Sequence, residues 1–269
     1  MNSTIGILGC GWLGLPLAQS LLTEGYRVHG STTSPEKLNL LKTMGIQAFL
    51  VSLGPDTVTG DIPAFLSTVD ILIINVPPKL RGGNTASFIK KMQRLLDVIK
   101  ASDIKKIVFV SSTSVYGEIE GELTESTVPL PGTESGKQLL ASEGLFANDD
   151  QLQTTIIRFG GLIGPTRHPI THLSGKKQLP NGNAYINLIH LEDCIRIITA
   201  IVTEGWWNEL FNGVYPHHPT KKEYYTLEAQ KRELLPPEYL PNDREMGKKI
   251  ISNRLINVKK FDFTTSIQS

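Results

Sequence analysis

The 269-residue sequence predicts an α/β fold of the Rossmann type, a doubly wound parallel sheet with a small C-terminal substrate lobe. Three features indicate this fold. Short apolar runs alternate with helical patterns along the first half of the chain, as βαβ units require. The first run leads through the turn Gly9-x-Gly11-x-x-Gly14 into an apolar helix. The run VDILIINV at 69–76 is continuously apolar, which is typical of a central parallel strand buried on both faces.

The individual elements follow from local patterns. Strands are expected in short β-rich apolar runs, at residues 5–8, 26–31, 47–51, 69–76, 106–110 and 154–158. Helices are expected between and after these runs, at residues 12–23, 35–44, 85–101, 135–146, 191–203 and 221–233. Gly25 and Gly45 are placed to end the first two helices, because glycine readily adopts the left-handed conformation that follows many helices.

The glycine turn indicates a dinucleotide-binding site. Gly9 allows a tight turn off the strand, Gly11 lets the backbone approach a pyrophosphate, and Gly14 lets the helix pack closely on the sheet. The free N–H groups that begin the helix, together with Trp12 and Leu13 inside the turn, would then lie against the phosphates. A purely structural glycine turn is the alternative, and the flanking strand and helix favour the binding site over it.

The composition changes after about residue 160. Glycine, proline and histidine become frequent in GGLIGPTRHP and KKQLPNGNAYIN, and strong strand patterns become rare. We therefore expect residues 1–160 to form the NAD(P)-binding Rossmann domain. Residues 161–269 are expected to complete the sheet and to add a small substrate-binding lobe. Ligands of open α/β sheets lie beyond the carboxyl ends of the strands, so this lobe would form the other wall of a cleft.

Charge and cysteine content exclude several classes of protein. The net charge is +1, the pI is about 7.8 and long charge runs are absent, so neither nucleic acid nor a membrane is an expected partner. The two cysteines, Cys10 and Cys194, suit a reducing compartment. Without a signal-peptide pattern or a membrane-length apolar run, a cytoplasmic protein is expected. No metal site is expected, because His217 and His218 lack other clustered ligands.

The end of the second strand bears on the choice of coenzyme. NAD-selective sites carry Asp or Glu about 20 residues beyond the first glycine, but this sequence has Ser31, Thr32 and Thr33. Hydroxyl groups tolerate a 2′-phosphate that a carboxylate would repel, so NADP is preferred over NAD. The alternative is that these residues only cap the helix at Pro35. Four residues at the end of the fourth predicted strand are also expected to line the coenzyme: Asn75, Val76, Pro77 and Pro78.

A set of longer segments carries a family resemblance. VSSTSVYG at 110–117, the helix LLASEGLF, the run RFGGLIGP and the segment INLIHLED occur in that order after the glycine turn. Together they resemble the extended short-chain dehydrogenase/reductases, the NAD-dependent epimerase/dehydratase family that acts on nucleotide sugars. The resemblance runs from about residue 4 to 215. A dehydrogenase of the 6-phosphogluconate or hydroxyacid type shares the glycine turn but would not explain these later segments.

The resemblance implies a catalytic serine but departs from the family at the proton donor. Ser112 matches the serine that binds the reacting oxygen, and Ser111, just before it, is expected to line the coenzyme. The family's Tyr-x-x-x-Lys acid/base pair falls on Ser135 and Leu139. A positioned acid/base typically contributes about 10²–10⁴-fold in rate, and an unassisted serine hydroxyl is too weak an acid to replace it. The proton donor is therefore unknown.

Three residues remain as candidate donors, each with an ordinary alternative. Tyr116 lies in the VYG turn, where an aromatic residue more often packs. Lys137 is on the right helix but off the expected face. His190 matches a family segment whose histidine bridges the substrate lobe to the sheet.

Four polar residues are expected around the cleft: Arg158, Arg167, His168 and Asn187. Arg81, in a basic loop, and Arg167 are candidates for binding an anionic substrate group, and Asn187 is a further substrate contact. A solvated loop and an ordinary surface arginine are the alternatives for the two arginines. Arg158 ends a buried strand and is expected to pair with a carboxylate.

Two functions remain in competition. The first is an NAD(P)-dependent oxidoreductase or epimerase that acts on a small polar, nucleotide-sugar or anionic substrate with a non-standard acid/base. The second is a non-catalytic NADP-binding redox sensor or scaffold, which the missing Tyr and Lys favour. By analogy with the family, a homodimer would form through helices 85–101 and 135–146.

Overall fold

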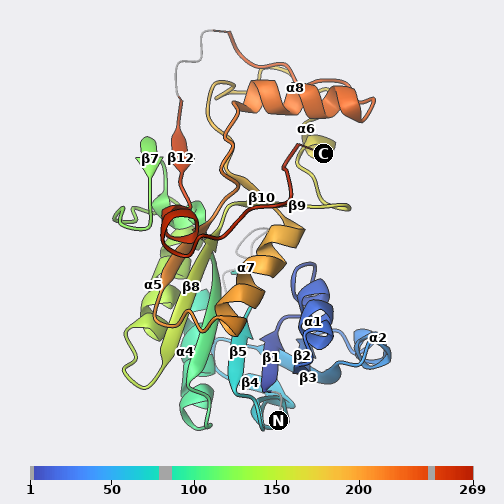
Figure 1. Cartoon of the computed structure of the whole chain (residues 1–269), viewed down its shortest axis with the longest axis vertical. Helices are drawn as coiled ribbons and strands as arrows, with labels where there is room; N and C mark the ends of the chain where they lie inside the picture. Colours follow the sequence, from blue (N-terminus) through green and yellow to red (C-terminus); the bar gives the residue numbers. More distant parts are fainter. Residues whose placement is uncertain (1–2, 79–86, 242–245, 269) are drawn as a thin grey trace.

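A computed structural model describes residues 3–78, 87–241 and 246–268. Its main sheet has eight strands in the order β4-β3-β2-β1-β5-β6-β8-β11, and every pair is parallel except β3 with β4 (Figure 1). The strands are β1 Thr4–Leu8, β2 Arg27–Thr32, β3 Gln47–Leu53, β4 Val58–Gly60, β5 Ile71–Ile74, β6 Lys106–Ser112, β8 Gln153–Phe159 and β11 Leu210–Gly213. The predicted Rossmann-type parallel sheet is confirmed.

Helices cover both faces of this sheet: α1 Gly14–Thr23, α2 Lys37–Thr43, α3 Ile62–Leu66, α4 Phe88–Lys100, α5 Glu134–Ala147 and α7 Leu191–Thr203. Two further helices, α6 Ile170–Leu173 and α8 Lys221–Lys231, pack away from the sheet in a separate core. One apolar core joins α3, α4 and α5 to one face of the sheet, and a second joins α1, α2 and α7 to the other. Successive residues of β5 enter opposite cores, which explains why this strand is apolar throughout.

The strand order reverses beside β1, which lies between β2 and β5. At such a switch point the connections leave the sheet in opposite directions, and a crevice opens at the carboxyl ends of the strands. The glycine turn follows β1 and Asn75 follows β5, so both lie at this crevice. The fold therefore places the predicted dinucleotide site where open α/β sheets bind their ligands.

The later part of the chain builds a lobe beyond the carboxyl edge (Figure 1). Its strands form two small parallel pairs: β9 Gly161–Ile163 with β10 Leu188–His190, and β7 Gly121–Leu123 with β12 Lys248–Ile250. A third core joins α6, α8 and the C-terminal tail, where Ile267 is buried. Residues after 160 also supply β11 to the main sheet and α7 to one of its faces.

Boundaries moved by a few residues relative to the sequence patterns. Helix α1 begins at Gly14 rather than at residue 12, and α2 begins at Lys37 rather than at residue 35. The strands that the patterns missed, β4, β7, β9, β10, β11 and β12, have three or four residues each, too few for an alternating pattern to be visible.

Helices α4 and α5 lie side by side on one face of the sheet and share its core (Figure 1). A homodimer through these two helices stays a prediction. Among the residues that the structure describes, no helix has the length and apolar character needed to cross a membrane.

Candidate functional site

The glycine turn is held by two side chains that sequence reasoning assigned to the coenzyme. The backbone N–H of Gly9 donates to Ser31 Oγ at 2.9 Å, and Asn75 Nδ2 donates to the carbonyl oxygen of Gly9 at 3.1 Å. Gly9 has a φ of 106°, a conformation that side chains disfavour. Ser31 and Asn75 therefore fix the path of the backbone around the predicted phosphate site.

The three glycines of the turn differ in what surrounds them. A Cβ on Gly9 would lie 2.5 Å from the carbonyl oxygen of Asn75, and a Cβ on Gly14 would overlap the carbonyl oxygen of Gly9. A Cβ on Gly11 would meet nothing within 4 Å. The fold itself thus requires Gly9 and Gly14, whereas Gly11 leaves open space beside its backbone.

Backbone donors face the same region. Among the described residues, the N–H groups of Trp12, Leu13 and Gly14 have no backbone acceptor, as is usual where a helix begins. The positive end of the α1 dipole adds to their attraction for an anion. Open space at Gly11 beside unpaired amides fits the diphosphate of a dinucleotide.

The end of β2 has no carboxylate. Ser31 is buried, Thr33 is exposed, and Thr32 Oγ1 accepts a hydrogen bond from the N–H of Ser34 at 3.1 Å. Thr32 therefore stabilises the local turn before α2, but it does not cap the helix, because Glu36 is the N-cap residue and no side chain caps α2. Val76, Pro77 and Pro78 continue from β5 along the crevice, whereas Arg81 lies outside the described residues.

Ser111 and Ser112 have different environments at the end of β6, because successive side chains of a strand point to opposite faces. Ser111 is buried, and its hydroxyl donates to Glu143 Oε1 at 2.5 Å. Ser112 is half-buried, and its Oγ accepts from the N–H of Ser114 at 3.1 Å, which begins the 3₁₀ turn Thr113–Tyr116. The Ser112 hydroxyl keeps its own proton to donate.

A buried ion pair lies under these serines. Arg158 Nη2 is 2.6 Å from Glu143 Oε2, and both side chains are almost fully buried. Arg158 Nη1 donates to the Tyr116 hydroxyl at 3.1 Å, and Tyr116 donates to Asn212 Oδ1 at 2.9 Å. The expected carboxylate partner of Arg158 is confirmed as Glu143.

Tyr116 has no exposed atoms facing the crevice. Its side chain is fully buried, its ring packs under the Arg158 guanidinium, and burial raises the pKa of its hydroxyl. The structure supports the packing alternative for this residue.

Helix α5 carries Ser135 and Leu139, the two positions on which the resemblance places the family's acid/base pair. It begins after Thr133, whose Oγ1 accepts from the N–H of Gly136 at 3.1 Å. Leu139 is buried in the core and Ser135 is half-buried. Lys137 is exposed to solvent.

His190 begins α7. Its Nδ1 accepts from the N–H of Glu192 at 3.2 Å. This contact places His190 between the lobe strand β10 and α7, the bridging position that was its ordinary alternative.

A cavity of about 620 Å³ lies between the turn after β6 and the lobe. Thr113, Asn187, Lys221 and Lys248 line it, together with the carboxylates of Glu118 and Glu120. Thr113 follows Ser112 in the chain, but Ser112 itself is not among the residues that line the cavity.

Asn187 uses its amide to hold the wall of this cavity. Its Nδ2 donates to the carbonyl oxygen of Lys248 at 2.9 Å, and its Oδ1 accepts from the N–H of Ile250 at 2.7 Å. Lys248 Nζ in turn donates to the carbonyl oxygen of Gly117, and burial lowers the pKa of this ammonium group. Sequence reasoning missed Lys248, because the three-residue strand that carries it has no recognisable pattern.

Arg167 does not line the cavity but lies at the glycine turn. Its guanidinium is 5.1 Å from the centre of the Trp12 ring, and Trp12 Nε1 donates to Thr166 Oγ1 at 3.3 Å. Arg167 itself is exposed.

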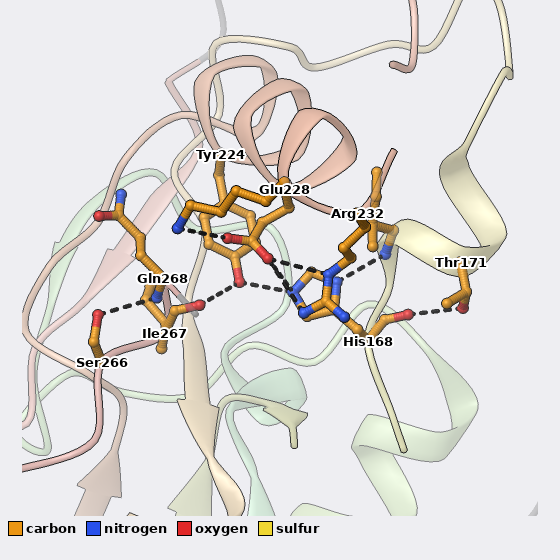
Figure 2. Close-up of polar contacts among 10 residues, drawn as sticks. His168, Thr171, Tyr224, Glu228, Arg232, Ser266, Ile267 and Gln268 are labelled. Atoms are coloured by element: carbon orange, nitrogen blue, oxygen red, sulfur yellow. Dashed lines mark hydrogen bonds and ion pairs between the residues drawn. The ribbon is translucent and has the colours of Figure 1, made fainter. Parts of the chain in front are cut away.

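His168, the next residue, is buried and ties the lobe to the C-terminal tail (Figure 2). Its Nδ1 accepts from the N–H of Ile170 at 3.2 Å, and its Nε2 is 2.9 Å from the Tyr224 hydroxyl. Tyr224 donates to the carbonyl oxygen of Ile267 at 2.7 Å. His168 is therefore a structural residue.

Comparison with known proteins agrees with this geometry. A family model described as NAD(P)H-binding matches residues 9–195. The protein YeeZ of Escherichia coli (strain K12) is 34% identical over 262 residues, which are 96% of this chain and 95% of YeeZ. The chain belongs to the NAD(P)-binding epimerase/dehydratase family of extended short-chain dehydrogenase/reductases.

Solved structures of this family share the fold. One from Methylobacillus flagellatus, named as a candidate NAD-dependent epimerase/dehydratase, is 26% identical with a TM-score of 0.77, covering 99% of this chain and 94% of its own. The UDP-glucuronic acid 4-epimerase of Bacillus cereus, solved with NAD, is 19% identical with a TM-score of 0.80, covering 98% and 93%. The resemblance inferred from sequence is thereby confirmed.

Neither a metal nor a reactive thiol is evident in the described part of this epimerase/dehydratase homologue. No group of three or more His, Cys, Asp or Glu residues there could hold a metal ion. Burial raises the pKa of the Cys10 thiol to about 12, so the cysteine inside the turn stays protonated.

We predict that breaking the Glu143–Arg158 pair strongly destabilises the protein. Glu143→Gln or Arg158→Met should each lower the free energy of unfolding by roughly 3–5 kcal/mol, because the remaining group is left buried without its partner. The double variant Glu143→Leu with Arg158→Met should recover part of this loss. Urea unfolding measures all three.

The exposed pair Arg94–Asp97 provides the control for that experiment. Arg94→Ala should change the free energy of unfolding by less than about 1 kcal/mol, as expected of a solvated pair. A buried-pair variant that is no less stable than Arg94→Ala would contradict the prediction.

We also predict acid sensitivity from His168. Burial, and next the charge of Arg232, lower the pKa of His168 from 6.5 to about 4. The unfolded chain therefore binds the extra proton more strongly between about pH 4 and 6.5, and stability falls as the pH drops through this window, by at most about 1.4 kcal/mol per pH unit. Urea unfolding at pH 7.5 and 5.5 should show a smaller drop in His168→Gln than in wild type.

Some acid sensitivity should remain in that variant, because burial also lowers the pKa of His218. Replacing the exposed His172 by Gln should leave the wild-type drop unchanged. An equal drop in His168→Gln and wild type would show that His168 does not contribute.

Proposed function

We propose that this protein is an NAD(P)-dependent oxidoreductase or epimerase that acts on a small polar, nucleotide-sugar or anionic substrate and prefers NADP to NAD. The observation that carries the proposal is the open space at Gly11. The fold gives this position no steric need for glycine, whereas a dinucleotide diphosphate needs the backbone to be approachable there.

Chain groups of two kinds would hold the coenzyme. The amides of Trp12, Leu13 and Gly14 would bind the diphosphate, and residues 75–78 would pass beside it. A bound nicotinamide coenzyme would supply hydride chemistry. The remaining catalytic groups are the chain's own, and Ser112 is the central one, since its half-buried hydroxyl keeps a proton to donate to a reacting oxygen.

The preference for NADP rests on the end of β2. A carboxylate there would repel a 2′-phosphate, and the described residues 31–34 supply only hydroxyls and amides. Lys37, exposed at the start of α2, would add a positive charge.

The charged wall of the cavity supports a polar substrate. Lys221 and Lys248 supply two cations and Glu118 and Glu120 two carboxylates, and Asn187 holds the strand that carries Lys248. Substrates named for structural neighbours, such as UDP-glucuronic acid, carry both a diphosphate and a carboxylate. We propose a nucleotide sugar or a smaller anionic compound as the substrate class.

The second candidate, a non-catalytic NADP sensor, is favoured by Ser135 and Leu139. Buried Leu139 supplies no charge that would lower the pKa of a neighbouring hydroxyl, and Lys137 is exposed. A sensor would bind the coenzyme but would not turn over a substrate. Coenzyme binding is therefore expected of both functions, and only catalytic activity distinguishes them.

A matched pair of glycine variants tests the coenzyme site. Gly11→Ala should keep the unfolding midpoint of wild type, because its Cβ meets no atom, but should weaken NADPH binding at least about tenfold by blocking approach of the diphosphate. Gly14→Ala should instead lower stability by roughly 1–3 kcal/mol through overlap with Gly9. Calorimetric titration and thermal melts measure both effects.

Two results would count against the proposal. If the wild-type protein binds neither NADPH nor NADH, it has no coenzyme site. If Gly11→Ala binds the coenzyme as tightly as wild type, the open space at Gly11 is not needed for the diphosphate. Titration with the two coenzymes also decides the preference, since equal or tighter binding of NADH would remove it.

Nicotinamide absorbance distinguishes the enzyme from the sensor. Incubated with either coenzyme and a panel of UDP-sugars, sugar acids and small carbonyl compounds, the enzyme should change absorbance at 340 nm or convert a sugar to its epimer. Ser112→Ala should lose about 10²-fold or more of this turnover and keep its affinity for NADPH. Tight coenzyme binding without turnover of any compound would favour the sensor.

A further inference from the structure

A short turn of the lobe closes on the glycine turn of the Rossmann sheet. After β9, Gly164 and Arg167 exchange two backbone hydrogen bonds of 2.9 and 3.0 Å, so Pro165 and Thr166 form the tip. A Cβ on Gly164 would lie 2.9 Å from the ring of Trp12. The turn therefore packs directly on the indole, and a larger residue at 164 would push it away.

Two side-chain contacts fix the turn against Trp12. Trp12 Nε1 donates to Thr166 Oγ1 at 3.3 Å, and the Arg167 guanidinium is 5.1 Å from the ring centre, within the range of a cation–π contact. Trp12 directly follows Gly11, the glycine with open space beside it. The contact with the indole therefore places the Arg167 guanidinium next to the proposed diphosphate site.

The charge of Arg167 is uncompensated within the described part of the chain. Its guanidinium forms no ion pair or side-chain hydrogen bond there, whereas Arg94, Arg158 and Arg196 each pair with a carboxylate. An exposed arginine whose only side-chain contact is an aromatic face keeps its N–H donors for a ligand. A diphosphate can accept two parallel hydrogen bonds from one guanidinium group.

We propose that Arg167 binds the diphosphate of the coenzyme from the lobe side, opposite the amides that begin α1. This inference rests on the proposed function, and it differs from the substrate contact that the sequence suggested for Arg167. Its position favours the coenzyme, because Arg167 contacts the glycine turn and is not among the residues that line the 620 Å³ cavity. A bound coenzyme would then connect the Rossmann sheet to the lobe that forms the cavity wall.

The test measures coenzyme affinity rather than turnover. Calorimetry on the full-length protein compares wild type, Arg167→Ala, Arg167→Lys and the matched control Arg94→Ala with whichever of NADPH and NADH wild type binds more tightly. Arg167→Ala should weaken binding roughly tenfold or more, which is typical of a lost charge-assisted contact. Arg167→Lys should recover part of the affinity as a point charge, and Arg94→Ala should bind as wild type.

A ligand without a diphosphate locates the contact. Adenosine and 2′-AMP carry the adenosine end of the coenzyme only, so Arg167→Ala should bind them as wild type does. The dependence of coenzyme affinity on salt should also be weaker in Arg167→Ala, because one cation no longer faces the phosphates. Equal thermal melts of wild type and Arg167→Ala would show that the exposed substitution leaves the fold intact.

The outcomes separate the two proposals. Wild type that binds no coenzyme overturns the proposed function. Wild type that binds, with Arg167→Ala of equal affinity, overturns the role of Arg167 alone. An equal loss of affinity for 2′-AMP would place the contact at the adenosine end and also overturn the diphosphate assignment. A tenfold loss confined to the dinucleotide supports it.

Discussion

The buried ion pair between Glu143 and Arg158 is the interaction on which the carboxyl edge of the sheet depends. It links α5 to β8, binds the hydroxyl of Ser111 at the end of β6 and reaches Tyr116 in the following turn. Burying two charges away from water is tolerated only when each charge is held against the other. By fixing Ser111 on the core side, the pair leaves the neighbouring Ser112 half-buried on the opposite face of the strand.

Backbone geometry dominates the proposed coenzyme site. Ser31 and Asn75 use their side chains to shape the turn around Gly9, and the amides that begin α1 supply donors for phosphate. Such a site depends little on side-chain identity, so coenzyme binding there would not require a Tyr-x-x-x-Lys pair. Binding and proton transfer are separable parts of this fold.

Local patterns in the sequence were sufficient for six of the eight strands of the main sheet and for the glycine turn. The alternation of buried runs with helices depends on neighbours in the chain, and so does the turn between β1 and α1. The expected partner of Arg158 followed from its burial alone, since a buried charge needs an opposite one. The three-residue strands β7 and β12, and with them Lys248 at the cavity, had no visible local signal.

The sequence by itself determined the fold class and the family, because these depend on residue types at short, fixed spacings. Only the tertiary structure decided which polar side chains meet. Thr166 and Arg167 contact Trp12 across about 154 residues, and Asn187 binds β12 across about 60. Contacts of this kind form when the lobe packs on the sheet. They cannot be predicted from the periodicity of the sequence, because that periodicity reflects only neighbours in the chain.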